Sequence, residues 1–324
     1  MQIPTLAVKP GMLLKRRRFE GVGPYLAILV LLVVGTIMSP YFLIQRNLLS
    51  IVRLAAINGI VSTGQTFVIL AGGIDLSVGS VLGLSSTIVA KTQDWGALSF
   101  VFAMAAGGAV GLINGLLAIA LRSRRSTIIN SAFVVTLAGL TAWRGTALVI
   151  SQGHRIEGVA PSLRFLGGGN LGPVPMQIVL FALIAGGAFL VLGKTVFGRS
   201  VYAIGANPTA ARFSGIRANR VALLVFVISG LLAGFAGVVT ASWLNVGDSA
   251  FHGQGAELDS IAAVAVGGAV LGGGKGTIAG TIAGVLIIGI MYNLMNLAQV
   301  PGDFQYVVKG AIIVGAVALQ KARQ

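Results

Sequence analysis

The sequence lacks cysteine and has few charged residues. None of its 324 residues is cysteine, which excludes disulfides, thiolate metal sites and cysteine nucleophiles. Only 10% of the residues are charged, against the roughly 25% usual in soluble globular proteins. Hydrophobic residues make up 56% of the chain, and 47 further residues are glycine. This composition excludes soluble, disordered and coiled-coil proteins, and it predicts an all-α polytopic membrane protein.

Groups suited to catalysis are also scarce. Histidine occurs only at His154 and His252, far apart in segments that we expect to form exposed external loops. Glu257 and Asp259 lie close together, but they flank the start of an apolar stretch, where acids favour the helix dipole. No Ser-His-Asp arrangement and no acid–His relay within the apolar stretches is present. We therefore expect no enzyme, no metal site and no cofactor in this chain.

Long charge-free stretches predict about ten membrane-spanning helices, since roughly 20 apolar residues cross about 30 Å of hydrocarbon. A basic cluster at 15–18 precedes the first apolar stretch. That stretch is too long for the apolar region of a cleaved signal peptide. Lys309 extends the last stretch if its ammonium reaches the interface. No linker divides the chain, so residues 1–324 are expected to form one domain. The stretches are 21–45, 54–74, 76–90, 95–121, 126–143, 165–193, 221–247, 260–274, 276–302 and 310–320.

The charge distribution predicts the orientation. The net charge is +15, and only 7% of residues are aromatic, which argues against a nucleic-acid surface. With a cytoplasmic N-terminus, the inner segments carry 16 basic and two acidic residues. The predicted external connections, which include Arg144 and Lys309, carry seven basic and six acidic residues. This asymmetry follows the positive-inside rule and places both termini in the cytoplasm.

Two connections are longer than turns. Residues 152–174, rich in glycine and proline, should lie outside, and residues 194–220, with five basic and no acidic residues, inside. The nearly balanced outer charges suit docking of an external partner through ion pairs, although these residues could equally be solvated loop charges. The docking candidates are Arg155, Arg164, Asp248 and Asp303.

Uncharged amides within the predicted spans suggest a pathway for a neutral hydroxylated solute. An amide in hydrocarbon is costly unless it pairs or faces water, so interhelical hydrogen bonds are the alternative role. Few aromatics accompany these amides, whereas tight sugar sites combine rings with fixed polar groups. We therefore expect a weak, water-lined passage. The candidate lining residues are Asn58, Gln65, Asn114 and Asn293.

Glycine-rich segments have several expected roles. Residues 272–277 (GGGKGT) do not match a nucleotide-binding loop, because Gly276 stands where Ser or Thr is required. A tight turn is expected there. Asp75 should cap the N–H groups of residues 77 and 78, and a direct role in gating is the alternative. Small-residue stripes at 107–115 and 276–289 should allow close helix packing. Residues 72–77 and 267–274 are weakly similar broken joints, as inverted repeats would produce.

A short capped helix is predicted within the cytoplasmic connection. Asn207 has the character of an N-cap, Pro208 suits the first helical position, and Gly215 stops the helix. Such a small-residue helix must bury one face, and a soluble partner would provide the surface. The predicted coupling residues are Asn207, Pro208, Ala210, Ala211, Arg212 and Gly215.

Several stretches together carry a family resemblance. These are GGIDLSVG at 72–79, residues 197–216, ELDSIAAVAVGG at 257–268 followed by GGGKGTIAGT, and residues 293–297 and 305–310. Over essentially its whole length the chain resembles the membrane permeases of bacterial monosaccharide ABC importers, which include ribose, xylose and arabinose permeases. Two departures are Asn130-Ser131 where the family often has proline, and Ala206 in place of a usual glycine before Asn207.

The resemblance implies a type II importer fold, with ten helices per subunit and a homodimer around a central pathway in the bacterial inner membrane. It implies two further partners, an ATPase with two fused nucleotide-binding domains, which uses ATP and Mg, and a periplasmic sugar-binding protein. The solute would be a pentose or hexose. The alternatives are a permease of the same family for autoinducer-2 or an inositol, and a secondary sugar transporter.

Overall fold

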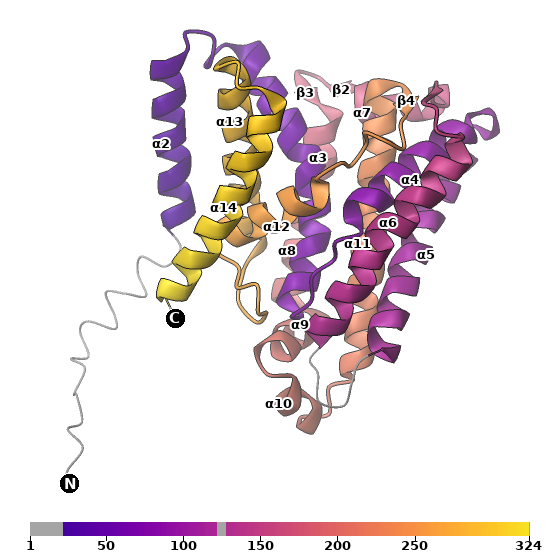
Figure 1. Cartoon of the computed structure of the whole chain (residues 1–324), viewed down its shortest axis with the longest axis vertical. Coiled ribbons are helices and arrows are strands. Elements are labelled where there is room, and N and C mark those ends of the chain that lie inside the picture. The colour runs from indigo at the N-terminus through magenta and orange to yellow at the C-terminus, as the bar shows by residue number, and fades with distance from the viewer. Residues whose placement is uncertain (1–21, 122–127, 324) are drawn as a thin grey trace.

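The computed structural model describes residues 22–121 and 128–323, and this part of the chain is almost entirely helical (Figure 1). The basic residues at 15–18 and 122–125 lie outside the described residues. Six described helices are long and apolar enough to cross a membrane. They are α3 (Gln45–Leu70), α5 (Leu98–Ala120), α6 (Ile128–Ser151), α8 (Met176–Lys194), α11 (Ala218–Leu244) and α13 (Ile278–Leu297).

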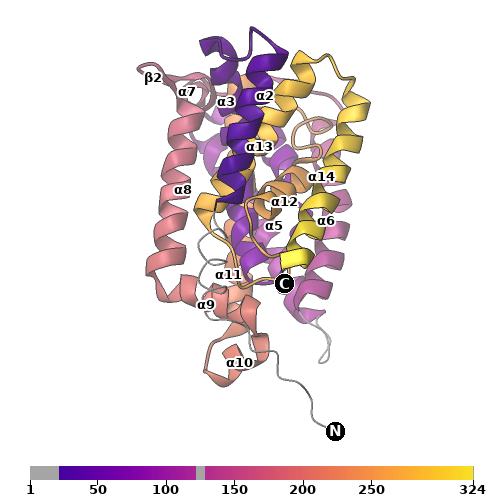
Figure 2. The same ribbon diagram turned by 90° about the vertical axis from the view of Figure 1, so that its left-hand side faces the viewer.

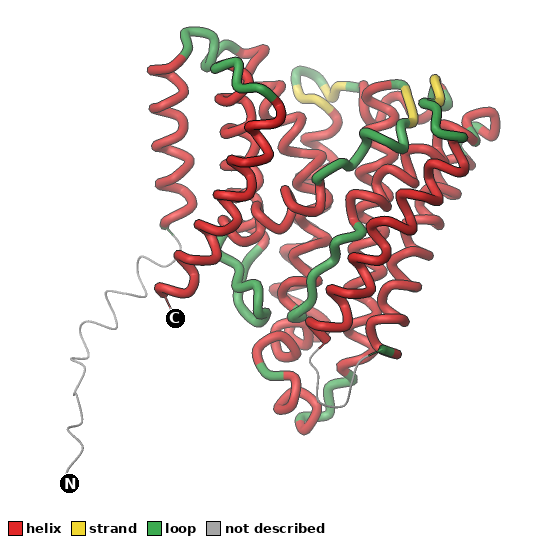
Figure 3. The backbone as a smooth tube through the Cα atoms, viewed as in Figure 1, coloured by secondary structure: helices red, strands yellow, loops and turns green. Residues whose placement is uncertain are grey.

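Four further helices fall in the other predicted spans. They are α2 (Gly23–Met38), α4 (Val78–Lys91), α12 (Ala256–Val266) and α14 (Gly302–Arg323). At 1.5 Å per residue, α4 and α12 are about 21 and 17 Å long, less than the roughly 30 Å of hydrocarbon. Non-helical segments, 71–77 before α4 and 248–255 before α12, extend toward opposite ends of the molecule (Figure 3). The predicted count of ten crossings thus depends on two half-length helices and remains a prediction.

Short elements occupy the two ends of the molecule. Helices α9 (Val196–Ala206) and α10 (Pro208–Phe213) lie at one end, which is the lower end in Figures 1 and 2. The other end carries α7 (Arg164–Gly168), the 3-10 turns 93–95 and 161–163, and two small antiparallel ladders. In these, β1 (Ile156–Glu157) pairs with β4 (Val246–Gly247), and β2 (Asn170–Leu171) pairs with β3 (Val174–Pro175). The two long connections therefore lie at opposite ends, as the charge pattern predicts.

Helix α11 packs most extensively against α5, α4 and α3, and its contact with α5 depends on glycine. A Cβ added at Gly111 would lie 3.0 Å from the Phe226 carbonyl carbon and still closer to its oxygen. A Cβ at Gly230 would collide with the Gly107 carbonyl oxygen in the same way. Gly280 and Gly284 of α13 meet the backbone of α12 as closely. Both predicted small-residue stripes are therefore packing surfaces, consistent with the way membrane helices associate.

The two joints of weakly similar sequence lie in direct contact. The Gly274 N–H donates to the Leu70 carbonyl oxygen at 2.9 Å, and a Cβ on Gly273 would lie 2.9 Å from the Cα of Gly72. Gly72, Gly273 and Gly274 all have positive φ angles of +74 to +94°, a region that favours glycine. The break after α3 and the turn before α13 are thus one continuous structural unit.

Candidate functional site

The joint between α3 and α4 is held by a buried polar network around Asp75. Its Oδ1 accepts hydrogen bonds from the Ser77 N–H at 3.0 Å and the Ser77 hydroxyl at 2.6 Å, and its Oδ2 accepts one from the Ser229 hydroxyl at 2.9 Å. The amide of Gln65 faces the backbone N–H and carbonyl of Asp75 at 3.2 Å each. The predicted cap is confirmed for residue 77. Asp75 thereby fastens the joint to α11 as well.

Three of the four candidate lining amides have polar partners within the chain, and two of them connect different helices. Gln65 is fully buried beside Asp75, and Asn114 donates to the Ser77 hydroxyl at 2.8 Å. Asn293 exchanges two hydrogen bonds with Asn47, at 2.6 and 3.0 Å. Asn58 is half-buried on α3. The geometry therefore matches the alternative role, as interhelical hydrogen bonds, for Asn114 and Asn293, whereas Gln65 bonds the segment that follows its own helix. Exposure of these residues to a pathway remains a prediction.

Residues 248–255, here called the outer segment, are fastened to α4 and α6 by side chains. Nη1 of Arg144 donates to the carbonyl oxygens of Ser249 at 2.6 Å and His252 at 2.7 Å. Nδ1 of His252 shares a 2.5 Å hydrogen bond with the Ser86 hydroxyl, and the hydroxyls of Ser151 and Ser249 are 2.8 Å apart. These bonds hold a non-helical stretch of chain against two helices.

Two expectations are corrected at the outer segment. His252 is not an exposed loop residue, because it is 8% exposed and bonded to α4. Arg144 is not in an external connection, because α6 continues to Ser151 and places Arg144 two turns before its end. The sequence does offer a clue to the role of Arg144, because this residue is an isolated cation in an otherwise uncharged helical stretch.

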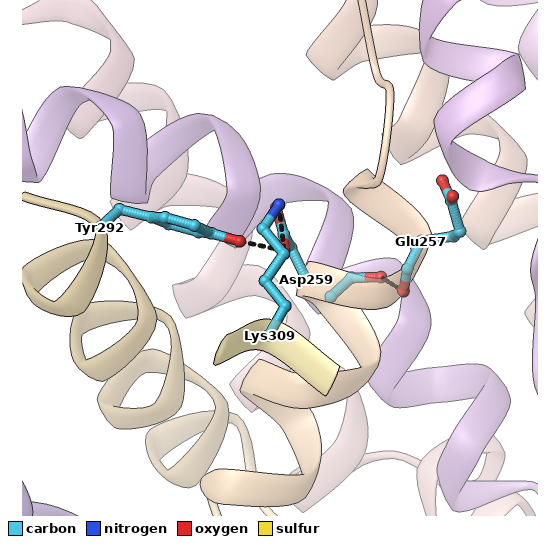
Figure 4. A network of polar contacts seen from close by, with 5 residues as sticks. Glu257, Asp259, Tyr292 and Lys309 are labelled. Carbon is cyan, nitrogen blue, oxygen red and sulfur yellow. Dashed lines mark hydrogen bonds and ion pairs between the residues drawn. The ribbon is translucent and has the colours of Figure 1, made fainter. Parts of the chain in front are cut away.

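A second network joins α12, α13 and α14 (Figure 4). Nζ of Lys309 lies 3.1 and 3.2 Å from the two carboxylate oxygens of Asp259, and the Tyr292 hydroxyl donates to Asp259 Oδ1 at 2.7 Å. The ammonium also lies 4.5 and 5.2 Å from the ring centres of Tyr292 and Tyr306. Lys309 is therefore paired within the chain, and its reach to the membrane interface remains a prediction. Its partner, 50 residues away, cannot be identified from a hydropathy pattern. The Glu257 carboxylate points away from this pair.

The docking candidates lie at the end that carries β1 and β4. Arg155 forms an exposed ion pair with Glu157 at 3.3 Å, and Arg164 donates to the Val159 carbonyl at 3.1 Å. Asp248 accepts hydrogen bonds from two N–H groups in the outer segment. Asp303 is exposed in the first turn of α14. The β1–β4 pairing brings Arg155 and Asp248 into one region, whereas Asp303 belongs to α14.

At the opposite end, the predicted capped helix is present as α10. Oδ1 of Asn207 accepts a hydrogen bond from the Ala210 N–H at 3.0 Å, Pro208 is the first helical residue, and Gly215 has φ of +80°. Ala211, however, is 4% exposed and packs within the chain's own core. Phe213 is 90% exposed at the end of α10. Among the predicted coupling residues, Ala211 is thus buried, whereas Ala210 and Arg212 are exposed, and their contact with a partner remains a prediction.

The end of α9 packs directly on the two joints. A Cβ added at Gly205 would collide with the Leu70 carbonyl oxygen and lie 2.5 Å from the Gly274 nitrogen. One turn earlier, the Tyr202 hydroxyl donates to the Gly276 carbonyl at 2.9 Å. Burial raises the pKa of the Tyr202 phenol, so it remains a donor at neutral pH. We call this contact of Gly72, Gly205, Gly273 and Gly274 the glycine junction.

No nucleotide or metal site is evident in the described residues. Residues 270–277 form a turn closed by the Val270 N–H and the Lys275 carbonyl at 2.8 Å, and no strand precedes it. This confirms the predicted tight turn. Within the described ranges, no three His, Asp or Glu side chains are grouped to hold a metal ion.

Comparison with known proteins assigns the chain to a family. Residues 47–317 match the family described as branched-chain amino acid transport system / permease component. The ribose import permease protein of Bacillus subtilis is 40% identical over 95% of this chain and 96% of its own length. That of Escherichia coli K12 is 34% identical, over 92% and 93%. The L-arabinose ABC transporter permease protein of Azospirillum brasilense is 37% identical, over 93% and 88%. No solved structure matches the chain.

Proposed function

The chain belongs to the family of monosaccharide ABC importer permeases, and from that premise we propose that it passes a pentose or hexose, delivered by a periplasmic binding protein, across the bacterial inner membrane. A separate ATPase with two fused nucleotide-binding domains supplies the energy by hydrolysing ATP with Mg. The permease acts as a homodimer with its termini in the cytoplasm. The observation that carries this proposal is the near full-length similarity to ribose and arabinose permeases.

The end of the molecule with α10 is suited to receive the ATPase. A soluble partner can bury the exposed ring of Phe213, and aromatic anchors in partner pockets contribute much of the binding energy at protein interfaces. The same connection, residues 194–220, carries exposed arginines at 199, 212, 217 and 220. Movement of α10 would reach the transmembrane helices through α9 and the glycine junction, because backbone atoms there are in contact without intervening side chains.

Uptake measurements test the proposal. The permease, its ATPase and its binding protein would be produced in cells that lack ribose uptake, and accumulation of labelled D-ribose would be compared with D-xylose, L-arabinose and D-allose. We expect uptake of at least one of these sugars that requires both partners. Uptake by the permease alone would identify a secondary transporter, and uptake of none of the four would refute the monosaccharide assignment.

A substitution at α10 tests the coupling surface. We expect Phe213→Glu to reduce sugar uptake and sugar-stimulated ATP hydrolysis at least tenfold without lowering the amount of permease in the membrane. Tyr41→Glu is the matched control, because Tyr41 is 66% exposed in the turn between α2 and α3, outside the residues assigned to either partner. Equal ATP hydrolysis in the two variants would remove Phe213 from the ATPase interface.

A further inference from the structure

We propose that Arg144 is a positioning residue, which holds the outer segment closed over α4, and that its bonds to the segment must break in each transport cycle. The proposal rests on the transport function above. It concerns residues 248–255, which complete the chain path between β4 and the half-length helix α12.

The outer segment is irregular backbone in a membrane protein. Its N–H and C=O groups need partners, and in membrane proteins such segments occur only where they are buried in protein or line a water-filled cavity. Arg144 supplies partners to two carbonyls from α6. An arginine within a membrane helix is costly and marks functional pathways by default.

Glycines of α4 allow the outer segment to lie directly on the helix. A Cβ on Gly83 would lie 2.7 Å from Nη1 of Arg144 and 2.8 Å from the His252 carbonyl oxygen. A Cβ on Gly79 would collide with the Gly253 carbonyl oxygen. Gly79 and Gly83 are one turn apart and share a face, so the outer segment lies against the backbone of α4 at these two positions. The segment therefore closes against backbone, which leaves little space for a solute to pass.

The contacts that hold the outer segment against α4 and α6 are weak enough to break. The outer segment is fastened through a few side-chain hydrogen bonds, and its large apolar residue, Phe251, is 73% exposed. Regions that bury few apolar side chains open at low free energy, and released polar groups can bond to water instead. By contrast, the α5–α11 contact is continuous close packing.

An external partner can influence the outer segment through β4. Gly247 of β4 pairs with Ile156, next to the docking candidate Arg155, and the following residue, Asp248, begins the segment. A binding protein that docks on residues 152–175 would contact a surface continuous with it. Docking can bias a closed and an open arrangement if the partner binds them with different affinity.

A reversible disulfide tests whether the segment must move. The hydroxyls of Ser151 and Ser249 are 2.8 Å apart, so Ser151→Cys with Ser249→Cys places two thiols within bonding reach, and the chain has no other cysteine. Cross-link formation is measured by mass spectrometry, and uptake of a sugar that the unmodified importer carries is measured before and after reduction of the same complete importer. We expect oxidation to lower uptake at least tenfold and reduction to restore it.

The comparison within one preparation cancels the effect of the substitutions themselves. The single variant Ser249→Cys, treated identically, controls for the oxidant. Equal uptake by the cross-linked and reduced double variant would overturn the proposal, because a permanently closed segment would then be compatible with transport. If the unmodified importer takes up none of the sugars, the proposed function fails instead, which is a separate outcome.

Substitution of Arg144 separates positioning from general support of the fold. We expect Arg144→Gln to raise ATP hydrolysis in the absence of binding protein several-fold while sugar uptake falls, since the segment is no longer held closed. Arg144→Lys should partly restore the coupling, because an ammonium can bond the same carbonyls. A fall in uptake and ATP hydrolysis in proportion to the amount of folded permease would show a purely structural role and overturn the assignment.

Discussion

Removal of the Lys309 ammonium should destabilise the permease strongly. Lys309→Met keeps the length of the side chain but leaves Asp259, whose side chain is 11% exposed, without its ion-pair partner. Breaking a buried pair by removing one partner costs roughly 3–5 kcal/mol. The Tyr292 hydroxyl still donates to Asp259, so we expect the low end, about 3 kcal/mol.

Reversible unfolding in detergent, followed by tryptophan fluorescence and circular dichroism, measures this change. A loss of about 3 kcal/mol lowers the ratio of folded to unfolded protein roughly a hundredfold. Arg155→Met is the matched control, because it breaks an ion pair whose side chains are 70% and 78% exposed. Exposed pairs contribute about 0–1 kcal/mol.

The double variant provides a second check. Lys309→Met combined with Asp259→Asn removes both charges and retains an acceptor for the Tyr292 hydroxyl. Replacing both members of a buried pair is often nearly neutral, so most of the lost stability should return. If Lys309→Met is no more damaging than Arg155→Met, or if the double variant is as unstable as the single one, the ion pair does not stabilise the folded protein.

Three further predictions concern packing and access. Gly205→Ala should reduce sugar uptake, because the added methyl meets the backbone of α3 and of the turn before α13, and such overpacking costs about 1–3 kcal/mol. The control Gly187→Ala adds a methyl in open space and should leave uptake unchanged in the same assay. Gly230→Val should prevent accumulation of folded permease, seen as a lost monodisperse peak in size-exclusion chromatography, since the side chain meets the α5 backbone. Asn114→Cys should resist a water-soluble maleimide while Phe213→Cys reacts readily; equal labelling would show that Asn114 is open to water.

The position of local features could be predicted from the sequence. Apolar stretches and the distribution of basic residues predicted where helices occur and which connections share an end, because hydrocarbon length and membrane charge asymmetry act on contiguous residues. The cap at Asn207, the stop at Gly215 and the glycine stripes follow from backbone geometry within one or two turns. The family resemblance arises from the same contiguous motifs.

The partners of polar residues could not be predicted in this way. The amides at 65, 114 and 293 were recognised as costly in hydrocarbon, but a linear pattern shows the cost and not how it is compensated. Asn114 pairs with a serine 37 residues away, and Asn293 pairs with an asparagine 246 residues away. Lys309 and Arg144 were assigned to the surface because charges near the end of an apolar stretch usually reach water.

The sequence by itself thus determined a multi-pass helical permease, its two distinct ends, its short capped helix and its close helix packing. Only the tertiary structure decided that Lys309 pairs with Asp259, that Arg144 and His252 fasten the outer segment, and that Gly72, Gly205 and Gly273 meet. The physical reason is that helix formation and membrane insertion depend on neighbours along the chain. The placement of buried charges and of close backbone contacts depends on residues brought together only when the helices pack.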